Sequence, residues 1–497
     1  MTRPGGADDR APCVIGVGQV ANHSSDASET EPMELWAQSC TLALADCGSR
    51  RGITSLDSLS VVRCDSWSYD RPAQRLAERM GFSPRHLMDS SLGGHQPQVL
   101  LHTVSDAIAG GRMGLALVVS AEALHTAAAV GRRGDALPWG NPVPPQPLDM
   151  GEFFHESEVH HGMLPIMRSF ALRDTARRAH LGAGVEEYAR EPATIYAAMS
   201  EVAAANPYAW HRTAKTPEEV VKVGPDNRMP VHPYPKFMMA SPKVNLAAAV
   251  LVASQAAADA LGVPVDRRVY LRGWSSARDY PYVAENEDLW RSRAMELATA
   301  HALRRAGLGL DDLDHFDLYS CFPSALRFAT DALGRRLDDR RGVTVTGGMP
   351  YAGAPGSGYV THALAAMTSR LREGVGSGLV SGLSAQMATH TVSVLSATPG
   401  TGDPASFGTA TPLPPPTARR EIRAQGHGPA VLEGYAVACT HEGADELAVA
   451  VCGLPDGGRC YAQTRDAGLL QWLSGSEGVG RRVELVAGEG GLNQLMV

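Results

Sequence analysis

The chain has 497 residues, 44% of them apolar, and its 45 basic against 53 acidic residues give a formal net charge of −8. A chain this apolar buries enough surface to offset its ordering entropy, which excludes a disordered protein, and its length favours two to four folding units. The negative charge gives no general attraction to nucleic acid or to anionic membranes. We therefore expect a small molecule or another protein as the partner.

The cysteines and the apolar stretches indicate the compartment. Eight cysteines are scattered along the chain without a CxxC pair, which favours free thiols in a reducing compartment and no structural zinc. The N-terminal residues lack the basic region of a signal peptide. The longest strongly apolar stretch, near residues 244–254, is far shorter than the roughly 20 residues of a membrane helix. A cytoplasmic protein without a membrane partner is expected.

The first part of the chain alternates between strand-like and helix-like segments. Short apolar runs predict the strands, and apolar residues spaced three and four apart predict the helices. The segments are a strand at 14–20, a helix at 33–47, a strand at 59–63, a helix at 73–80, a turn at 90–94, a helix at 97–109 and a strand at 115–120. This alternation predicts an α/β fold.

A similar unit returns in the second part of the chain. A glycine-rich turn at 353–358 precedes a helix, and a glycine-rich break at 374–378 precedes an apolar strand. The apolar face of that helix carries Val360, Leu364, Met367 and Leu371. Repetition of a half-domain is the simplest explanation, so we expect a duplicated α/β domain.

Three further segments break this alternation. Residues 125–240 hold proline-rich turns and helices near 166–179 and 193–206, which predicts an inserted domain. Residues 399–418 are rich in proline and predict a linker. Residues 419–497 alternate as short strands around one helix at 467–473, which predicts a small β-rich, OB-like domain.

Two motifs suggest a bound dinucleotide or metal ion, but the residues around them do not fit either kind of site. The glycines of residues 15–21 fit GxGxxA, but a polar loop follows where a dinucleotide site needs a helix at once. His155, His160 and His161 do not have the spacing that places two imidazoles on one helical face. We expect neither a metal nor a tightly bound cofactor.

The segment DLYSCFP at residues 317–323 is a candidate for chemistry. It places a phenol, a hydroxyl and the Cys321 thiol just before a predicted helix, and thiols at helix N-termini can have lowered pKa values. The alternative is a buried and inert cysteine, which is the commoner situation.

Several motifs in one order resemble the thiolase superfamily, in particular the sterol-carrier-protein-x thiolases and the type 1 thiolase-like proteins. They are VIGVGQ, the Gly-Gly turn and LVVSAEA, then PYPKFMMASPKVNLAAA, DLYSCF in the place of HDCF, and GGMPYAGAPG in the place of GGxxxxGHPxG. The resemblance runs over residues 14–396 and implies two βαβαβαββ halves in five αβαβα layers. The halves would be 1–124 with about 241–265, and 266–398, and the insertion at 125–240 would be the loop domain of the family.

The same resemblance implies that the usual catalytic residues are missing. Thiolases use a nucleophilic cysteine, an activating histidine and a second cysteine for proton transfer. Here the nucleophile position falls at or near Gly94, the GHP histidine becomes Ala354, and residues 374–398 hold no cysteine. The candidate substitutes are Cys321, Tyr319, which takes the place of the HDCF histidine, His95 and His390. Other residues expected in the pocket are Gly94, Tyr351, Gly353, His362 and Ser381.

The resemblance also predicts a function for the few lysines of the chain. The chain has only four, and all lie between residues 215 and 243. The loop domain of thiolases contacts CoA, whose phosphates favour cationic side chains. The expected CoA-binding residues are Lys215, Lys222, Arg228, Lys236 and Lys243.

Together these features predict a thiolase-like protein that binds acyl-CoA or a related acyl thioester and lacks ordinary thiolase catalysis. It would either carry out a divergent acyl transfer or bind without catalysis. Two alternatives remain: a retro-aldolase or other carbon-carbon bond enzyme of the superfamily, and a scaffold without catalysis. The assembly is expected to be a monomer or a homodimer.

Overall fold

The computed structural model describes residues 8–145, 147–374 and 376–496, and within them a nine-stranded sheet has the order β3-β2-β4-β5-β1-β6-β9-β8-β7. The strands before residue 260 are β1 (Pro12–Ala21), β2 (Ser58–Val61), β3 (His86–Asp89), β4 (Leu115–Ala123) and β5 (Asn245–Ser254). The later strands are β6 (Val269–Arg278), β7 (His315–Asp317), β8 (Ser377–Ser384) and β9 (Thr389–Ser396).

The sheet consists of two copies of one topology. In the first half β1 is antiparallel to β5, β5 is antiparallel to β4, and β4 is parallel to β2. In the second half β6, β9, β8 and β7 repeat the same three pairings. The halves join where β1 pairs with β6. The predicted repeat is confirmed, and among the described residues only the edge strand β3 has no counterpart.

The repeat extends to one close approach between strand and helix. A β-carbon on Gly16 of β1 would overlap the backbone oxygen of Ala43, and one on Gly273 of β6 would overlap that of Ala302. Both glycines follow a shift in strand register. Each half therefore uses a glycine at the same place to let a helix lie directly on its first strand.

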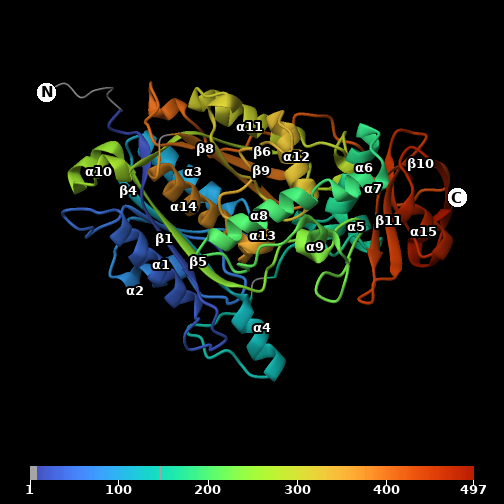
Figure 1. The fold of residues 1–497 in the computed structure, drawn as a ribbon, viewed down its shortest axis with the longest axis horizontal. Coiled ribbons are helices and arrows are strands. Elements are labelled where there is room, and N and C mark those ends of the chain that lie inside the picture. Colours follow the sequence, from blue (N-terminus) through green and yellow to red (C-terminus); the bar gives the residue numbers. More distant parts are fainter. Residues whose placement is uncertain (1–7, 146, 375, 497) are drawn as a thin grey trace.

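Helices form three layers, one outside each half-sheet and one between the two half-sheets (Figure 1). The outer layers are α1 (Pro32–Asp46) with α2 (Pro72–Met80) on the first half, and α11 (Arg293–Ala306) with α12 (Pro323–Leu333) on the second. Between the half-sheets lie α3 (Gln96–Ala109) and α14 (Tyr359–Arg372), which contact strands of both halves and are buried on most sides. The predicted five-layer αβαβα fold is confirmed.

Helices are the main regular elements of the insertion between β4 and β5. Its helices are α4 (Leu124–Arg133), α5 (Glu156–His160), α6 (Met167–Leu181), α7 (Val185–Arg190), α8 (Ala193–Ala205) and α9 (Pro217–Val221). Within the described residues, no helix has the length and apolar character needed to span a membrane.

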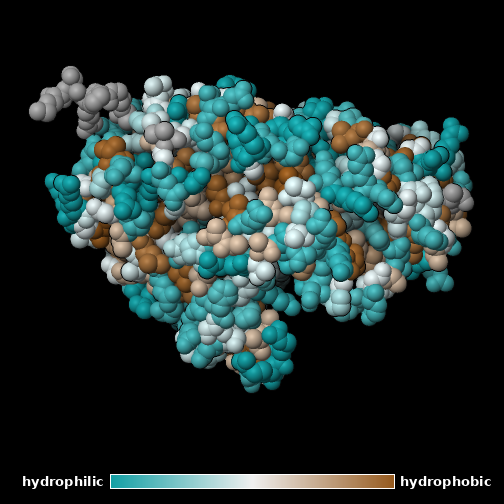
Figure 2. Space-filling view, viewed as in Figure 1, coloured by the Kyte–Doolittle hydropathy of each residue, from teal (hydrophilic) through white to brown (hydrophobic). Residues whose placement is uncertain are grey.

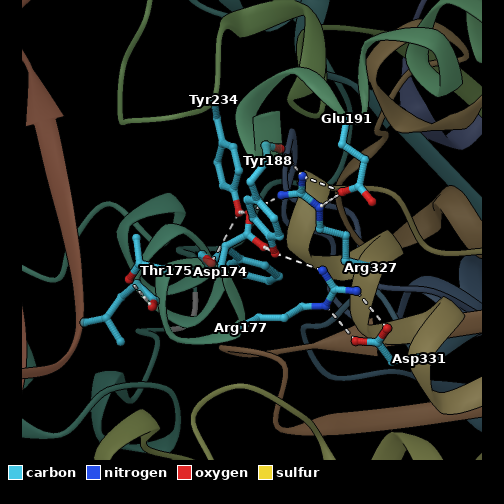
Figure 3. A network of polar contacts seen from close by, with 10 residues as sticks. Asp174, Thr175, Arg177, Tyr188, Glu191, Tyr234, Arg327 and Asp331 are labelled. Carbon is cyan, nitrogen blue, oxygen red and sulfur yellow. Dashed lines mark hydrogen bonds and ion pairs between the residues drawn. The ribbon is translucent and has the colours of Figure 1, made fainter. Parts of the chain in front are cut away.

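A buried network of charges fixes the insertion to the second half (Figure 3). The guanidinium of Arg327 on α12 donates to Asp174 of α6 at 2.7 Å and to Glu191 at 2.9 Å. Tyr234 donates to the same Asp174 carboxylate at 2.7 Å. Because the side chains of Arg327 and Asp174 are each 1% exposed, neither charge has water as an alternative partner.

The proline-rich segment at 399–418 is packed against the sheet, which differs from the predicted linker. Leu413 donates from its backbone nitrogen to Ser276 at 2.8 Å, and Trp274 donates in the same way to Phe407 at 3.1 Å. The segment therefore follows the part of β6 that β1 does not cover. Backbone groups on an open strand edge need partners, which the sequence pattern of a linker does not reveal.

The C-terminal residues form a closed barrel of the order β10-β11-β12-β14-β13. The strands are β10 (Gly428–Cys439), β11 (Asp445–Gly453), β12 (Arg459–Thr464), β13 (Arg482–Ala487) and β14 (Asn493–Met496), with α15 (Ala467–Gly475) between β12 and β13. The predicted small β-rich domain is confirmed, and five strands in a closed barrel suit the OB-like description.

The barrel lies against the insertion, at the C-terminal end of the molecule (Figure 1). The hydroxyl of Thr175 on α6 donates to the backbone oxygen of Tyr435 at 2.8 Å, and Arg178 donates to Glu477 at 3.0 Å. On the face shown in Figure 2, hydrophilic residues alternate with small apolar areas over both the main body and the barrel.

Candidate functional site

Two glycine-rich turns, one from each half, meet in front of the central helices. Gly93, before α3, donates from its backbone to the Ser357 hydroxyl at 3.0 Å. The hydroxyl of Ser120 at the end of β4 donates to the backbone oxygen of Gly358 at 3.2 Å, just before α14. The repeat thus brings Gly94 and residues 353–358 to one place.

Tyr319 fills the space beside Gly94. A β-carbon on Gly94 would overlap the phenol oxygen of Tyr319 and would lie 2.8 Å from the backbone oxygen of Leu383. The backbone nitrogen of Tyr319 donates to the Ser381 hydroxyl at 2.9 Å, which holds the residue in place. Residue 94 therefore has room for a hydrogen atom only, as long as residue 319 is a tyrosine in this position.

Little free volume remains beside this tyrosine. The cavity lined by Tyr319, Ser381, Leu383 and His390 measures about 10 Å³. Such a volume is about that needed to hold a single water molecule. An acyl group does not fit into this cavity without movement of the residues that line it.

The two candidate histidines are buried. His95 precedes α3, and its Nδ1 has no hydrogen-bond partner among the described residues. Burial, with the charge of Arg278, lowers the pKa of His95 to about 4. His390 lies with Nε2 2.9 Å from the Ser292 hydroxyl, and burial lowers its pKa to about 3. Both imidazoles are neutral at pH 7 and are weak proton acceptors there.

Cys321 has a different ionisation from the one its place before α12 suggests. Burial raises the pKa of its thiol, although the backbone N–H of Phe322 acts in the opposite direction. Burial also raises the pKa of Tyr319. Of the two alternatives considered for Cys321, the structure agrees with the buried thiol, because desolvation of the thiolate outweighs the backbone amides.

Part of the insertion covers the other expected pocket residues. The backbone nitrogens of Trp210 and His211 donate to the oxygens of Ala352 and Tyr351, at 3.1 and 2.8 Å. The buried hydroxyl of Tyr351 has no partner among the described residues. Gly353 has a φ of 105°, a conformation that favours glycine, and lies against the side chains of Val244, Leu246 and Trp210. This side of the site is closed by the insertion.

Comparison with known proteins agrees with this fold. No protein-family model and no curated protein matches the chain. A monomeric SCP2-thiolase-like protein type 1 from Mycobacterium smegmatis is 29% identical in sequence, with a TM-score of 0.83 over 99% of this chain and 100% of that chain. The chain has the fold of the thiolase superfamily.

Two enzymes of this superfamily share the fold at lower identity. An acetyl-CoA acetyltransferase from Syntrophomonas wolfei is 15% identical, with a TM-score of 0.57, and covers 78% of this chain and 99% of its own. Human mitochondrial 3-ketoacyl-CoA thiolase is 16% identical, with a TM-score of 0.58 over 78% of this chain and 100% of its own. Both support the thiolase fold for most of the chain.

Ala354, which the resemblance places at the GHP histidine, has a structural role in this thiolase-like fold. Ala354 is buried and donates from its backbone to the oxygen of Ser241 at 2.9 Å. His362 on α14 is a buried packing residue, with Nδ1 3.1 Å from the Oε1 of Gln19. Gln19 belongs to the VIGVGQ motif, so this contact joins the central helix to the first strand.

Two of the expected CoA-binding lysines, Lys215 and Lys236, lie near His211, and Lys215 also lies over an aromatic ring. The ammonium of Lys215 lies 4.1 Å from the centre of the Phe237 ring. Burial, and then the charges of Lys236 and Lys215, lower the pKa of His211. The ring of the neighbouring Trp210 stacks on His23 at 4.2 Å. We call Trp210, His211, Lys215, Lys236 and Phe237 the cationic–aromatic surface.

The other three expected CoA-binding residues lie outside the cationic–aromatic surface. Lys222 follows α9 and Lys243 precedes β5, and both are exposed. The backbone oxygen of Arg228 accepts a hydrogen bond from the backbone of Lys236. Within the part of the chain that the structure describes, none of the four lysines forms an ion pair. Their charges are therefore free to interact with a ligand.

One buried acid near the site is not among the expected residues. Glu122, in LVVSAEA at the end of β4, accepts hydrogen bonds from the backbones of Asp65 and Ser66, at 2.5 and 2.9 Å. Burial, together with the Asp65 charge, raises its pKa to about 7. A β-carbon on Gly356 would lie 2.5 Å from Glu122, so the acid supports the second glycine turn. The sequence does contain a signal for this residue, because Glu122 is the one acidic residue in the otherwise largely apolar strand β4.

Proposed function

We propose that this protein binds CoA or an acyl-CoA through its inserted domain and does not carry out thiolase acyl transfer. The observation that carries the second part is the Tyr319 hydroxyl in the space beside Gly94, where the family places its nucleophile. Binding and catalysis are separable here, because the proposed ligand contacts lie on the insertion and the filled site lies between the halves.

The proposal that acyl transfer is lost rests on the groups left near Gly94. An acyl-enzyme needs a nucleophile that is ionised or next to a base. The thiol of Cys321 and the phenol of Tyr319 are both buried with raised pKa values. His95 and His390 are weak bases, with pKa values lowered to about 4 and about 3. None of these groups has the ionisation that nucleophilic attack on a thioester requires.

The proposal of CoA binding rests on the cationic–aromatic surface. The ligand carries phosphates and an adenine ring, which pair with lysine charges and stack on aromatic side chains. Lys215 and Lys236 supply charges without acidic partners among the described residues, and Trp210 and Phe237 supply rings beside them. Lys222, Arg228 and Lys243 would contribute less, since among the described residues only Lys215 of these cations lies over an aromatic ring.

Calorimetric titration with CoA, acetyl-CoA and a longer acyl-CoA tests the binding. We expect saturable heat with the wild type and at least about tenfold weaker binding for Lys236→Glu, equivalent to about 1.4 kcal/mol. Arg190→Glu replaces an exposed cation by an acid elsewhere on the insertion, outside the expected CoA-binding residues, and should leave the affinity nearly unchanged. Absence of heat with every ligand would remove the binding proposal.

Incubation with radiolabelled acetyl-CoA tests the loss of acyl transfer separately. We expect no label bound to the protein after denaturation and no product formed from acetyl-CoA. Turnover or a covalent acyl group would overturn this part, and mass spectrometry would identify the residue that carries the label.

We further propose that the protein is a monomer. The similar protein from Mycobacterium smegmatis is described as monomeric, and here residues 399–418 cover the free part of β6. Light scattering during size-exclusion chromatography should give the mass of one chain, and the mass of two chains would contradict the proposal. The cytoplasmic location stays a prediction.

A further inference from the structure

Three side chains of the kinds that bind metals converge between the insertion and the barrel. They are His232 of the insertion, Cys439 at the end of β10 and Asp445 at the start of β11. The Nε2 of His232 lies 2.8 Å from an Asp445 oxygen, and the Cys439 sulfur lies 3.7 Å from the same oxygen. All three ligand atoms lie within 4.8 Å of one another. Atoms this close can share one ion after small side-chain movements.

The backbones that carry these side chains are held by a short ladder. The nitrogen of His232 donates to Val437 at 2.8 Å, and the nitrogen of Cys439 donates to Pro230 at 3.0 Å. Cys439 also lies opposite Asp445 in the β10–β11 pairing. The three ligand positions are therefore fixed relative to one another by main-chain hydrogen bonds, before any ion binds.

The carboxylate has a supporting contact of its own. The second oxygen of Asp445 accepts a hydrogen bond from the hydroxyl of Ser474 on α15, at 2.5 Å. Hydrogen bonds of this kind orient metal-binding carboxylates and are part of most metal sites. Among the described residues, no lysine or arginine pairs with Asp445, so no side-chain cation competes for it.

We propose that His232, Cys439 and Asp445 bind a zinc ion. A thiolate, an imidazole and a carboxylate suit Zn²⁺, whereas Mg²⁺ and Ca²⁺ require oxygen ligands. Binding displaces the proton of the Cys439 thiol to solvent, and the neutral imidazole keeps its proton on Nδ1 while Nε2 binds the ion.

The fourth ligand of the zinc would come from the adjoining cavity. His232 and Ser474 line a cavity of about 520 Å³ between the insertion and the barrel. Three protein ligands leave one position of a tetrahedral zinc site for water or for a donor atom of a ligand in this space. The ion would also join the two domains and stabilise the folded chain when present.

Cobalt and zinc titrations of the full chain, after dialysis against EDTA, test the proposal. We expect one Zn²⁺ per chain by calorimetry, a higher melting temperature with Zn²⁺, and a thiolate-to-metal charge-transfer band with Co²⁺. Cys439→Ser should abolish that band, and His232→Gln should abolish stoichiometric binding. Ser474→Ala should weaken binding about 10- to 100-fold, as is usual for supporting contacts. His86→Gln on the exposed strand β3 is the matched control and should bind like the wild type.

A wild-type protein that binds no Zn²⁺ would overturn the proposal. So would a Co²⁺ complex without the thiolate band, or a band that persists in Cys439→Ser. If a ligand variant does not fold, the Co²⁺ spectrum of the wild type still decides whether the thiol binds the metal. These readouts do not involve CoA, so they are independent of the function proposed above.

Discussion

The phenol oxygen of Tyr319 occupies the space that a side chain on Gly94 would need. The two residues come from different halves of the repeat, and the backbone contact of Tyr319 with Ser381 holds the tyrosine there. The identities of residues 94 and 319 are therefore coupled. A nucleophile cannot be restored at residue 94 without a smaller residue at 319.

This coupling predicts a double-mutant effect. Gly94→Ala should lower the free energy of unfolding by about 1–3 kcal/mol, the usual range for overpacking a core. In the Tyr319→Ala background the same change should have a smaller effect, with a coupling energy of about 0.5–3 kcal/mol. Urea denaturation of the four proteins measures it. Additive effects would show that Tyr319 does not obstruct residue 94.

The buried ion pair in Figure 3 predicts a large effect on stability. Arg327→Met would leave the Asp174 carboxylate buried without its cation. Removal of one partner of such a pair typically lowers the free energy of unfolding by about 3–5 kcal/mol. Arg336→Met, which removes an exposed pair with Asp338, is the control and should have little effect. Thermal unfolding gives the melting temperatures of both variants, and Arg327→Met should unfold at a clearly lower temperature than Arg336→Met. Equal melting temperatures would contradict the prediction.

Glu122 predicts a pH dependence of stability. Its pKa is about 7 in the folded protein, against a reference value of 4.5, so the folded state binds more protons between these two values. The free energy of unfolding should therefore fall by about 3 kcal/mol on this account as the pH rises from about 4.5 to 7.

The variant Glu122→Gln isolates this contribution, because an amide does not titrate. We expect its free energy of unfolding to depend less on pH than that of the wild type, in urea titrations at several pH values between 5 and 8. The surface variant Glu373→Gln should follow the wild type. Parallel pH profiles for all three proteins would show that Glu122 has an ordinary pKa.

The paired glycines of β1 and β6 give a further prediction. Gly273→Ala should lower the free energy of unfolding by at least about 2 kcal/mol, since the two nearest atoms that its β-carbon would meet are backbone atoms of α11. Gly16→Ala should do the same in the first half. Gly131→Ala in helix α4 meets nothing within 4 Å and should stabilise that helix slightly. A harmless Gly273→Ala would show that helix and strand separate easily.

Local patterns were enough to predict most of the elements. The helices at 97–109 and 193–206 correspond to α3 and α8, because apolar spacing and glycine turns act within a few residues. Six strands are absent from the prediction: β3, β5, β6, β7, β9 and β14. Of these, β3 and β14 have only four residues each and leave part of their surface exposed. The packing of residues 399–418 along β6 depends on an open strand edge that no local pattern reveals.

The sequence by itself determined the duplicated α/β fold, the insertion and the identities of residues 94 and 354, because periodicity, motif order and residue type are properties of the chain. Only the tertiary structure decided that Tyr319 fills the space at Gly94 and that Cys321 keeps its proton. It also decided that His232 meets Cys439 and Asp445. The burial of a side chain and the charges around it depend on which distant segments pack together. Each of these findings therefore rests on contacts between residues far apart in the sequence.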